Sequence, residues 1–149
     1  MVYLYPLDTM AAYIGPSPNH QNGRSSSLKT RFLAGVLCAA RGVSLNEAAI
    51  DVDRDKIKSY MAFAKATADD MVGGRFDRLM KTDNDVCWQY TNRNKNTVYV
   101  CYFHILAAPN LPLGHVRLTG LESDAIYTLE DGTTYQGDAL MKNGLSLPA

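Results

Sequence analysis

The chain has 149 residues, of which 46% are hydrophobic and 20% charged, and its 15 basic and 15 acidic residues balance to a formal net charge of zero. This composition is typical of one globular domain or two small ones, and it excludes a disordered or fibrous protein. Because the basic residues are scattered, the sequence predicts neither nucleic acid nor a membrane as a partner, and no apolar run approaches the roughly 20 residues that span a bilayer.

The start of the chain and its cysteines both predict a cytoplasmic location. Residues 1–6 lack the positive start and the long apolar centre of a signal peptide. Cys38, Cys87 and Cys101 are unevenly spaced and form no Cys-x-x-Cys pair. They are therefore predicted to be buried free thiols in a reducing compartment, rather than zinc ligands or a redox pair.

In the first half, the pattern predicts a strand followed by helices. Residues 9–14 form a short apolar run that ends at Gly-Pro-Ser-Pro, as a buried strand does when it leaves a sheet. A helix is predicted over residues 28–40, with Ser27 as N-cap and Gly42 at its stop. The capping-box form of residues 44–47 predicts one more helical turn. A second helix is predicted over residues 53–71. Its apolar face is Ile57, Tyr60, Met61, Ala64, Ala68 and Met71.

After Gly74 the hydrophobic period changes from helical spacing to alternation. Strands are predicted at residues 75–79, 86–91, 97–106, 115–119 and 126–130. Residues 97–106 are apolar on both faces, which predicts a central strand. The predicted fold class is therefore α+β, with a domain boundary near Gly73 and a small antiparallel β-sandwich over residues 74–149. One strand and two helices leave a large apolar face uncovered, so residues 1–73 are predicted to be part of a larger domain.

The densest group of polar residues is the loop at residues 18–24, which follows the first predicted strand. Ligands of α/β proteins bind at the carboxyl ends of strands. The side chains of Asn19, His20, Gln21 and Arg24 offer the donors and acceptors that sugar hydroxyls need. The alternative is that these side chains only hold an irregular loop in shape.

Two other groups are weaker candidates for a site. His104 and His115, if on adjacent strands, offer two metal ligands, but no third ligand has suitable spacing, so no metal is predicted. Five aromatic residues in strands suit either a sugar-stacking platform or cross-strand core pairs, and the core interpretation is favoured. They are Trp88, Tyr90, Tyr99, Tyr102 and Phe103.

The acidic residues provide no convincing pair of catalytic carboxylates. Nearly all of them fall at helix starts, on solvated faces or in turns, where they serve capping and solubility. The three serines at residues 25–27 lack the glycine-flanked turn of a nucleophile elbow. No catalytic residue is therefore assigned within this sequence.

Several motifs resemble those of glycoside hydrolase family 36 α-galactosidases. Residues 5–12 (YPLDTMAA), 18–24 (PNHQNGR) and 28–31 (LKTR) resemble the last barrel segment of that family. Residues 102–113, 117–121 (RLTGL) and 135–141 (YQGDALM) resemble its C-terminal sandwich. The serines at residues 25–27 depart from the family, whose members more often have a proline there.

The resemblance implies a retaining hydrolase of terminal α-galactosides such as melibiose and raffinose. Residues 1–73 would then be the C-terminal end of a (β/α)8 barrel with a linking helix, and residues 74–149 the C-terminal β-sandwich. Both catalytic aspartates of the family belong to motifs that precede the Tyr-Pro-Leu segment, so this chain alone is expected to be inactive. Asn19, His20, Gln21 and Arg24 are expected at the active-site rim.

The resemblance further implies an α-galactoside as the substrate of the full-length enzyme, a homo-oligomeric parent, and neither metal nor organic cofactor. The competing hypothesis is a free-standing, non-catalytic sandwich that binds glycans or another subunit. That hypothesis predicts sugar binding that depends on Trp88 or a tyrosine.

Overall fold

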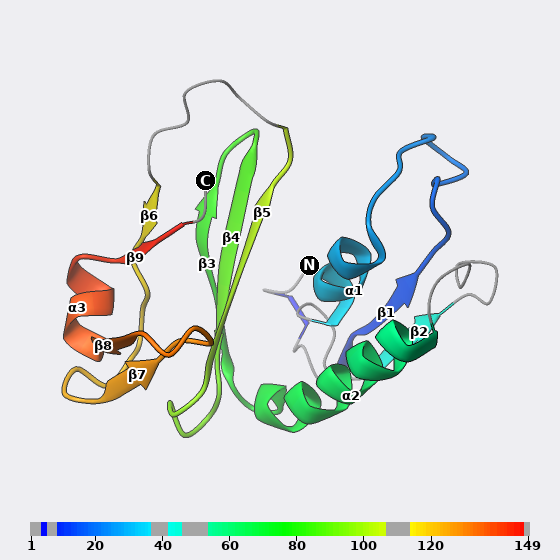
Figure 1. The fold of residues 1–149 in the computed structure, drawn as a ribbon. Helices are drawn as coiled ribbons and strands as arrows, with labels where there is room; N and C mark the ends of the chain where they lie inside the picture. Colours follow the sequence, from blue (N-terminus) through cyan, green and yellow to red (C-terminus); the bar gives the residue numbers. More distant parts are fainter. Residues whose placement is uncertain (1–3, 6–8, 37–41, 46–53, 107–113, 148–149) are drawn as a thin grey trace. The chain divides into compact units, whose positions relative to one another are not determined.

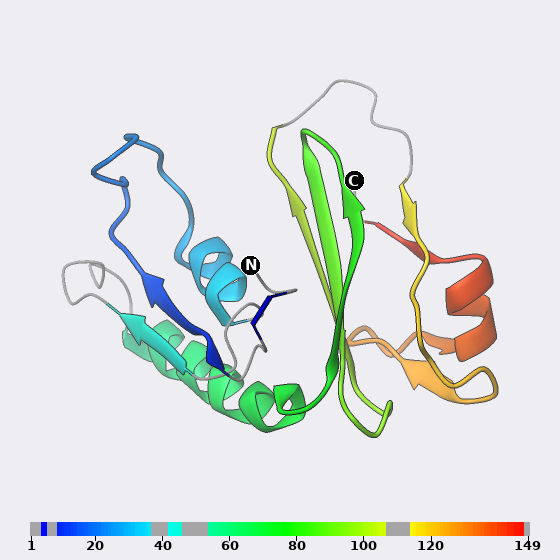
Figure 2. The same ribbon diagram turned by 180° about the vertical axis from the view of Figure 1, so that it is seen from behind.

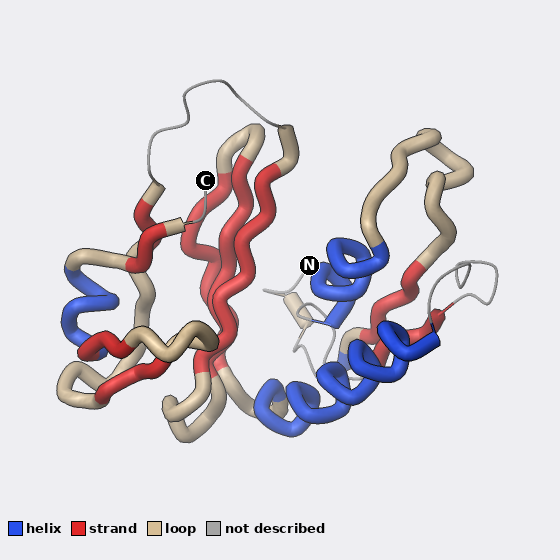
Figure 3. The backbone as a smooth tube through the Cα atoms, in the orientation of Figure 1, coloured by secondary structure: helices blue, strands red, loops and turns tan. Residues whose placement is uncertain are grey.

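The computed structural model describes all residues except 1–3, 6–8, 37–41, 46–53, 107–113 and 148–149. The chain forms two compact units, Met1–Gly73 and Gly74–Ala149. Figure 1 shows that strands and helices alternate in the first unit, and Figure 3 shows that strands and loops dominate the second.

The first unit alternates strand and helix. Its elements are β1 (Ala11–Ile14), α1 (Leu28–Val36), β2 (Gly42–Leu45) and α2 (Arg54–Met71). Strands β1 and β2 pair in parallel, from Ala11 opposite Gly42 to Ile14 opposite Leu45. A parallel pair needs a crossover connection, and the segment containing α1 provides it.

The two predicted helices are confirmed in this unit. Helix α1 begins at Leu28, and the Ser27 hydroxyl accepts a hydrogen bond from the Thr30 N–H at 3.0 Å, as an N-cap does. The predicted end of this helix, including Cys38, lies outside the described residues. Helix α2 begins at Arg54 and ends at Met71, within one residue of the prediction.

The prediction for residues 44–47 is wrong where the structure describes them. Gly42 begins strand β2 and Ser44 lies within it, so Ser44 starts no helix. The helix stop predicted at Gly42 is not tested, because residues 37–41 lie outside the described part of the chain. A four-residue strand is too short to show a period, and the serine and glutamate spacing imitates a capping box. Residues 46–53 lie outside the described part of the chain.

The core of the first unit forms where α1 and α2 meet the strand pair. Ile14, Phe32 and Val36 are buried, and the rings of Phe32 and Tyr60 stack at 5.0 Å. The predicted face of α2 is partly wrong, because Met61 is exposed while Phe63 packs against this core.

Thr67 is also buried on α2, although the pattern did not predict it. Its hydroxyl donates to the carbonyl oxygens of Phe63 at 3.0 Å and Ala64 at 3.2 Å, so the helix itself satisfies the polar group. A hydrophobicity pattern does not predict burial of a threonine whose hydroxyl is hydrogen-bonded within its own helix.

The second unit begins with a three-stranded antiparallel sheet. Its strands are β3 (Arg75–Lys81), β4 (Asp85–Thr91) and β5 (Val98–His104), in that spatial order. The prediction of a central strand at residues 97–106 is wrong, since β4 lies in the middle. Apolar residues on both faces of a strand indicate that both faces are covered. They do not indicate how many neighbouring strands it pairs with, and β5 pairs only with β4.

Short elements follow the sheet. They are β6 (His115–Val116), β7 (Ile126–Thr128), β8 (Thr134–Gln136), α3 (Gly137–Lys142) and β9 (Leu145–Ser146). β6 pairs with β9 and β7 with β8, both antiparallel. The predicted antiparallel character is confirmed, but the interpretation of the tail as β-rich missed helix α3. Figures 1 and 2 show that these elements all lie on one side of the three-stranded sheet.

The core of this unit lies between the sheet and those short elements. Cys87 of β4 is fully buried there, and β5 contributes Val98, Val100 and Tyr102. The segment after β5 contributes five buried residues: Val116, Leu118, Leu121, Leu140 and Leu147. The C-terminal third of the chain therefore covers one apolar face of the sheet.

A buried amide joins the sheet to the segment that covers it. Gln89 is fully buried, and its Nε2 donates to the Thr119 carbonyl oxygen at 2.6 Å and to the Thr91 hydroxyl at 2.7 Å. Its Oε1 accepts from the Thr119 N–H at 3.0 Å. The amide thus satisfies both backbone groups of Thr119, which stabilises the packing of the neighbouring leucines.

Gly137 at the start of α3 provides a test of this packing. A Cβ at Gly137 would lie 2.1 Å from the Glu122 carbonyl oxygen, whereas one at Gly114 would meet only ordinary contacts from 3.4 Å outward. We expect Gly137→Ala to lower the free energy of unfolding by about 1–3 kcal/mol, because backbone must shift to admit the methyl group. Urea denaturation followed by Trp88 fluorescence measures the loss, with Gly114→Ala as control. Equal stability of the two variants would contradict the packing described.

Candidate functional site

The polar loop after β1 is a compact turn built around Asn19. The Asn19 side-chain oxygen accepts from the N–H groups of Gln21 at 2.9 Å and Asn22 at 3.3 Å. The Asn19 backbone bonds to both Gly23 N–H (2.8 Å) and Arg24 carbonyl oxygen (2.9 Å). Gly23 adopts φ +68°, which closes the turn and which glycine adopts without strain.

The four predicted site residues divide into two kinds. Asn19 is partly buried and its side-chain oxygen holds the turn, as the structural alternative expected. His20, Gln21 and Arg24 are exposed on the turn that Asn19 organises. Their contact with a ligand stays a prediction.

Arg31 on α1 reaches back to the end of β1, a contact that the sequence pattern did not indicate. Its Nη1 donates to the carbonyl oxygen of Gly15, immediately after the strand. Gly35, one helical turn later, lies so close to β1 that an added Cβ would stand 3.2 Å from the Ala12 methyl. These contacts fix the starting point of the polar loop against α1.

The two histidines considered for a metal site have separate partners. His104 on β5 contacts Asp85 of β4, with Nδ1 2.8 Å from Oδ1, while His115 on β6 lies 3.2 Å from the Ser146 hydroxyl of β9. Their strands belong to different sheets, so the two histidines do not lie on adjacent strands. Within the described ranges, no three His, Cys, Asp or Glu side chains are grouped to hold a metal ion.

The Asp85 carboxylate is the centre of a hydrogen-bonded cluster. Its Oδ1 accepts from the Tyr102 hydroxyl at 2.6 Å and contacts His104, and its Oδ2 accepts from the Thr82 hydroxyl at 3.2 Å. The hydrogen bond from Tyr102, then that from His104, lowers the pKa of Asp85, and the same Asp85 bond raises the pKa of Tyr102. This carboxylate is therefore held ionised as an acceptor, the opposite of a general acid.

The aromatic residues of the sheet do not form one platform. Trp88 stacks on Phe103 with ring centroids 5.1 Å apart, and the pairing register places Tyr90 and Tyr99 on that same face. Tyr102 points to the opposite face, toward the core of the second unit. The core and cross-strand interpretation is therefore supported by the geometry.

Both cysteines that the structure describes are buried. Cys87 and Cys101 are buried free thiols, as the sequence predicted, and Cys38 lies outside the described residues. Burial raises the pKa of Cys87 to about 11, which keeps this thiol protonated and poorly nucleophilic near neutral pH.

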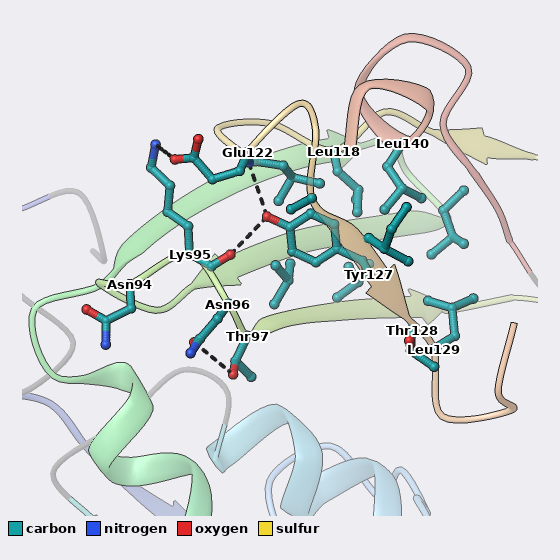
Figure 4. Close-up of a pocket in the computed structure, with 16 residues that line it drawn as sticks. Asn94, Lys95, Asn96, Thr97, Leu118, Glu122, Tyr127, Thr128, Leu129 and Leu140 are labelled. Carbon is teal, nitrogen blue, oxygen red and sulfur yellow. Dashed lines mark hydrogen bonds and ion pairs between the residues drawn. The ribbon is translucent and has the colours of Figure 1, made fainter. Parts of the chain in front are cut away.

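The second unit contains a cleft of about 530 Å³ beside the start of β5 (Figure 4). Its only carboxylate is Glu122, which forms an ion pair with Lys95 at 2.7 Å. Glycoside hydrolysis requires two carboxyl groups that flank the scissile bond. Among the described residues that line this cleft, there is no second carboxylate to form such a pair with Glu122.

The sequence of this chain is similar to those of known glycoside hydrolases. Residues 85–149 match the model of the glycosyl hydrolase family 36 C-terminal domain. The chain is 34% identical to the α-galactosidase AgaA of Geobacillus stearothermophilus and 31% identical to the bifunctional α-galactosidase/sucrose kinase AgaSK of Mediterraneibacter gnavus. These alignments cover 97% and 98% of this chain. The chain spans only about a fifth of the length of such relatives, 20% of AgaA and 16% of AgaSK.

Solved structures show the same relationship. The crystal structure of AgaA superposes on 97% of this chain with a TM-score of 0.88 at 32% identity, using 20% of its own length. The galactosidase domain of AgaSK superposes on 99% of the chain with a TM-score of 0.85 at 29% identity. A variant of AgaA was solved in complex with raffinose.

Among the helices that the structure describes, none is both long and apolar enough to cross a lipid bilayer.

The Asp85 cluster predicts how stability depends on pH. Because folding lowers the pKa of Asp85 below its ordinary 3.8, the carboxylate stabilises the fold at neutral pH, and this contribution disappears as pH falls from 3.8 through the folded pKa. We expect Asp85→Asn to be less stable than wild type at pH 7, with a difference that shrinks below pH 3.8. Urea midpoints across this range measure it. Asp83→Asn, at an exposed position just before β4, is the control. A difference between wild type and Asp85→Asn that does not depend on pH would contradict the assignment.

Proposed function

We propose, on the premise that residues 85–149 carry the C-terminal domain of glycoside hydrolase family 36, that the chain is the C-terminal part of a retaining α-galactosidase. The enzyme would hydrolyse terminal α-galactosides of the melibiose and raffinose type. The observation that carries the proposal is the match of nearly the whole chain to one fifth of AgaA, in sequence and in fold. The solved complex of an AgaA variant with raffinose supports this substrate class.

We further propose that the first unit is the end of a (β/α)8 barrel. Its order β1–α1–β2–α2 contains two consecutive strand–helix units, one more than the sequence pattern predicted. The parallel pairing of β1 with β2 is the pairing that a barrel repeats around its axis. Two parallel strands alone bury little surface, so further strands of the same kind would complete the layer.

The polar loop is proposed as part of the active-site rim. It follows the carboxyl end of β1, and enzymes with this barrel place their sites on the loops at that end of the strands. Asn19 fixes the backbone of the turn, while His20, Gln21 and Arg24 present exposed donors and acceptors suited to sugar hydroxyls.

The nucleophile and the acid/base of this reaction are proposed to come from residues outside this chain. A retaining mechanism requires two carboxyl groups about 5–5.5 Å apart, one forming a covalent glycosyl intermediate. Five of the described carboxylates lie in ion pairs with neighbouring basic side chains. These pairs are Asp55–Lys58, Asp77–Arg75, Asp85–His104, Glu122–Lys95 and Asp138–Lys142. The chain is proposed to need no cofactor, and the assembled enzyme to be a cytoplasmic homo-oligomer that contacts neither nucleic acid nor membrane.

A chimeric enzyme tests the proposed function. We expect AgaA whose C-terminal fifth is replaced by this chain to hydrolyse raffinose, because the replaced and replacing segments share fold and order of elements. AgaA lacking that fifth is the control and should have no measurable activity. The isolated 149-residue chain should not hydrolyse an α-galactoside either. Turnover by the isolated chain at the rate of AgaA would contradict the proposal.

Substitutions in the polar loop of the chimera test the proposed rim. Each of His20→Ala and Arg24→Ala is expected to lower kcat/KM for raffinose about tenfold, since one charged or polar contact to substrate contributes about 1.5 kcal/mol. Lys29→Ala, on the exposed side of α1, is the matched control. If all three variants retain full kcat/KM, the loop has only a structural role.

A further inference from the structure

The cleft of the second unit has apolar walls that the described residues of the chain do not fill. Figure 4 shows Tyr127 in its middle, with most of the polar groups gathered at one end. The apolar lining comes from β5, from the segment before α3, and from the residues around α3. It includes Val98, Val100, Leu118, Leu121, Leu140 and Leu145. A volume of about 530 Å³ falls within the roughly 300–1,000 Å³ of small-molecule sites.

The polar end of the cleft is fixed in shape before any ligand arrives. The Tyr127 hydroxyl donates to the Lys95 carbonyl oxygen at 2.9 Å and accepts from the Glu122 N–H at 3.1 Å. The side chains of Lys95 and Glu122 form an ion pair above it at 2.7 Å. Two of these contacts join segments about 30 residues apart in sequence, and the third closes the turn between Glu122 and Tyr127. A ligand therefore need not order a loop in order to bind.

The start of α3 supports the same rim from the other side. The Gly137 N–H donates to the Ala125 carbonyl oxygen at 2.9 Å, and the Asp138 N–H to that of Ser123 at 3.0 Å. The turn at residues 122–125 is thus held between α3 and the hairpin loop. Ala125 and Tyr127 keep their positions as walls of the cleft.

The cleft offers no unpaired charge among its described lining residues, which disfavours an ionic ligand. Lys95 and Glu122 neutralise one another, and the remaining polar lining consists of the amides of Asn94 and Asn96 and the hydroxyls of Thr97 and Thr128. A charged group entering this cleft would lose water without gaining an opposite charge. Amides and hydroxyls instead match the hydroxyl groups of a neutral molecule.

We propose that this cleft is a binding site for an uncharged amphipathic ligand with an apolar body and a hydroxyl-bearing end, the chemistry of an alkyl or aryl glycoside. The apolar body lies against Val98, Val100 and the Tyr127 ring. The hydroxyl-bearing end lies at the rim near Asn94 and Asn96. The site belongs to the second unit and stands independently of the proposed galactosidase activity.

Isothermal titration calorimetry of the purified chain tests the proposal with three probes. Monomeric n-octyl β-D-glucopyranoside, which has both parts of the ligand, is expected to bind saturably at one site. Glucose, which lacks the apolar body, should give no saturable heat at the same concentrations. Octyl sulfate, with a charged end, should bind at least tenfold more weakly. Equal or tighter binding of octyl sulfate would overturn the uncharged class, and absence of saturable octyl glucoside binding would overturn the site.

Matched variants locate the binding. Ala125→Phe fills the cleft from its wall and is expected to weaken octyl glucoside binding at least tenfold, whereas Ala66→Phe, on the exposed face of α2, should leave it unchanged. Thr128→Trp covers the cleft from an exposed strand position, so it serves if Ala125→Phe disturbs folding, as judged by its thermal unfolding curve. Thr133→Trp, outside the lining, is its control. Unweakened binding in Thr128→Trp and in a folded Ala125→Phe would overturn this location.

Discussion

The second unit depends on the buried amide of Gln89. The residues that cover the sheet after β5 form only short strands and one six-residue helix, so backbone pairing alone holds them weakly. Gln89 satisfies both the N–H and the C=O of Thr119 from within the sheet. Leu118 and Leu121, on either side, are thereby held in the core, where each buried leucine stabilises the fold by roughly 1.5–3 kcal/mol.

Similar hydrogen bonds hold the rest of the segment that covers the sheet. The Leu118 N–H donates to the Leu140 carbonyl oxygen at 3.1 Å, and Tyr127 bonds the hairpin loop and the 122 turn together. Side-chain and irregular backbone contacts therefore replace a second regular sheet. A covering layer built in this way packs well at Leu118 and Leu140 but leaves the cleft beside Tyr127, which gives the unit a concave surface.

The first unit follows a different rule, since its strands are parallel and each is followed by a helix. Parallel pairing places the ends of β1 and β2 at one edge, and the exposed side chains of the Asn19 turn lie beyond that edge. This arrangement concentrates the polar groups of the loop at that edge of the strand pair. The proposed active-site rim rests on this placement, because enzymes with a (β/α)8 barrel bind their substrates on the loops at the carboxyl ends of the strands.

The sequence by itself determined the elements whose pattern is local. The Ser27 cap, the long period of α2 and the alternation in β3 to β5 follow from helical or strand spacing. The motifs of the tail resemble those of the family whose C-terminal domain model matches residues 85–149. The sequence predicted a polar loop at residues 18–24, but it did not predict the hydrogen bonds that Asn19 forms within the turn.

Only the tertiary structure decided the features that depend on distant residues. The strand at Gly42–Leu45 exists because β1 offers it a parallel partner, and β4 rather than β5 is central because hydrogen bonding sets strand order. Gln89 is buried because Thr119, 30 residues away, satisfies its amide. Such contacts join positions that no local period relates, so the sequence pattern could not place them.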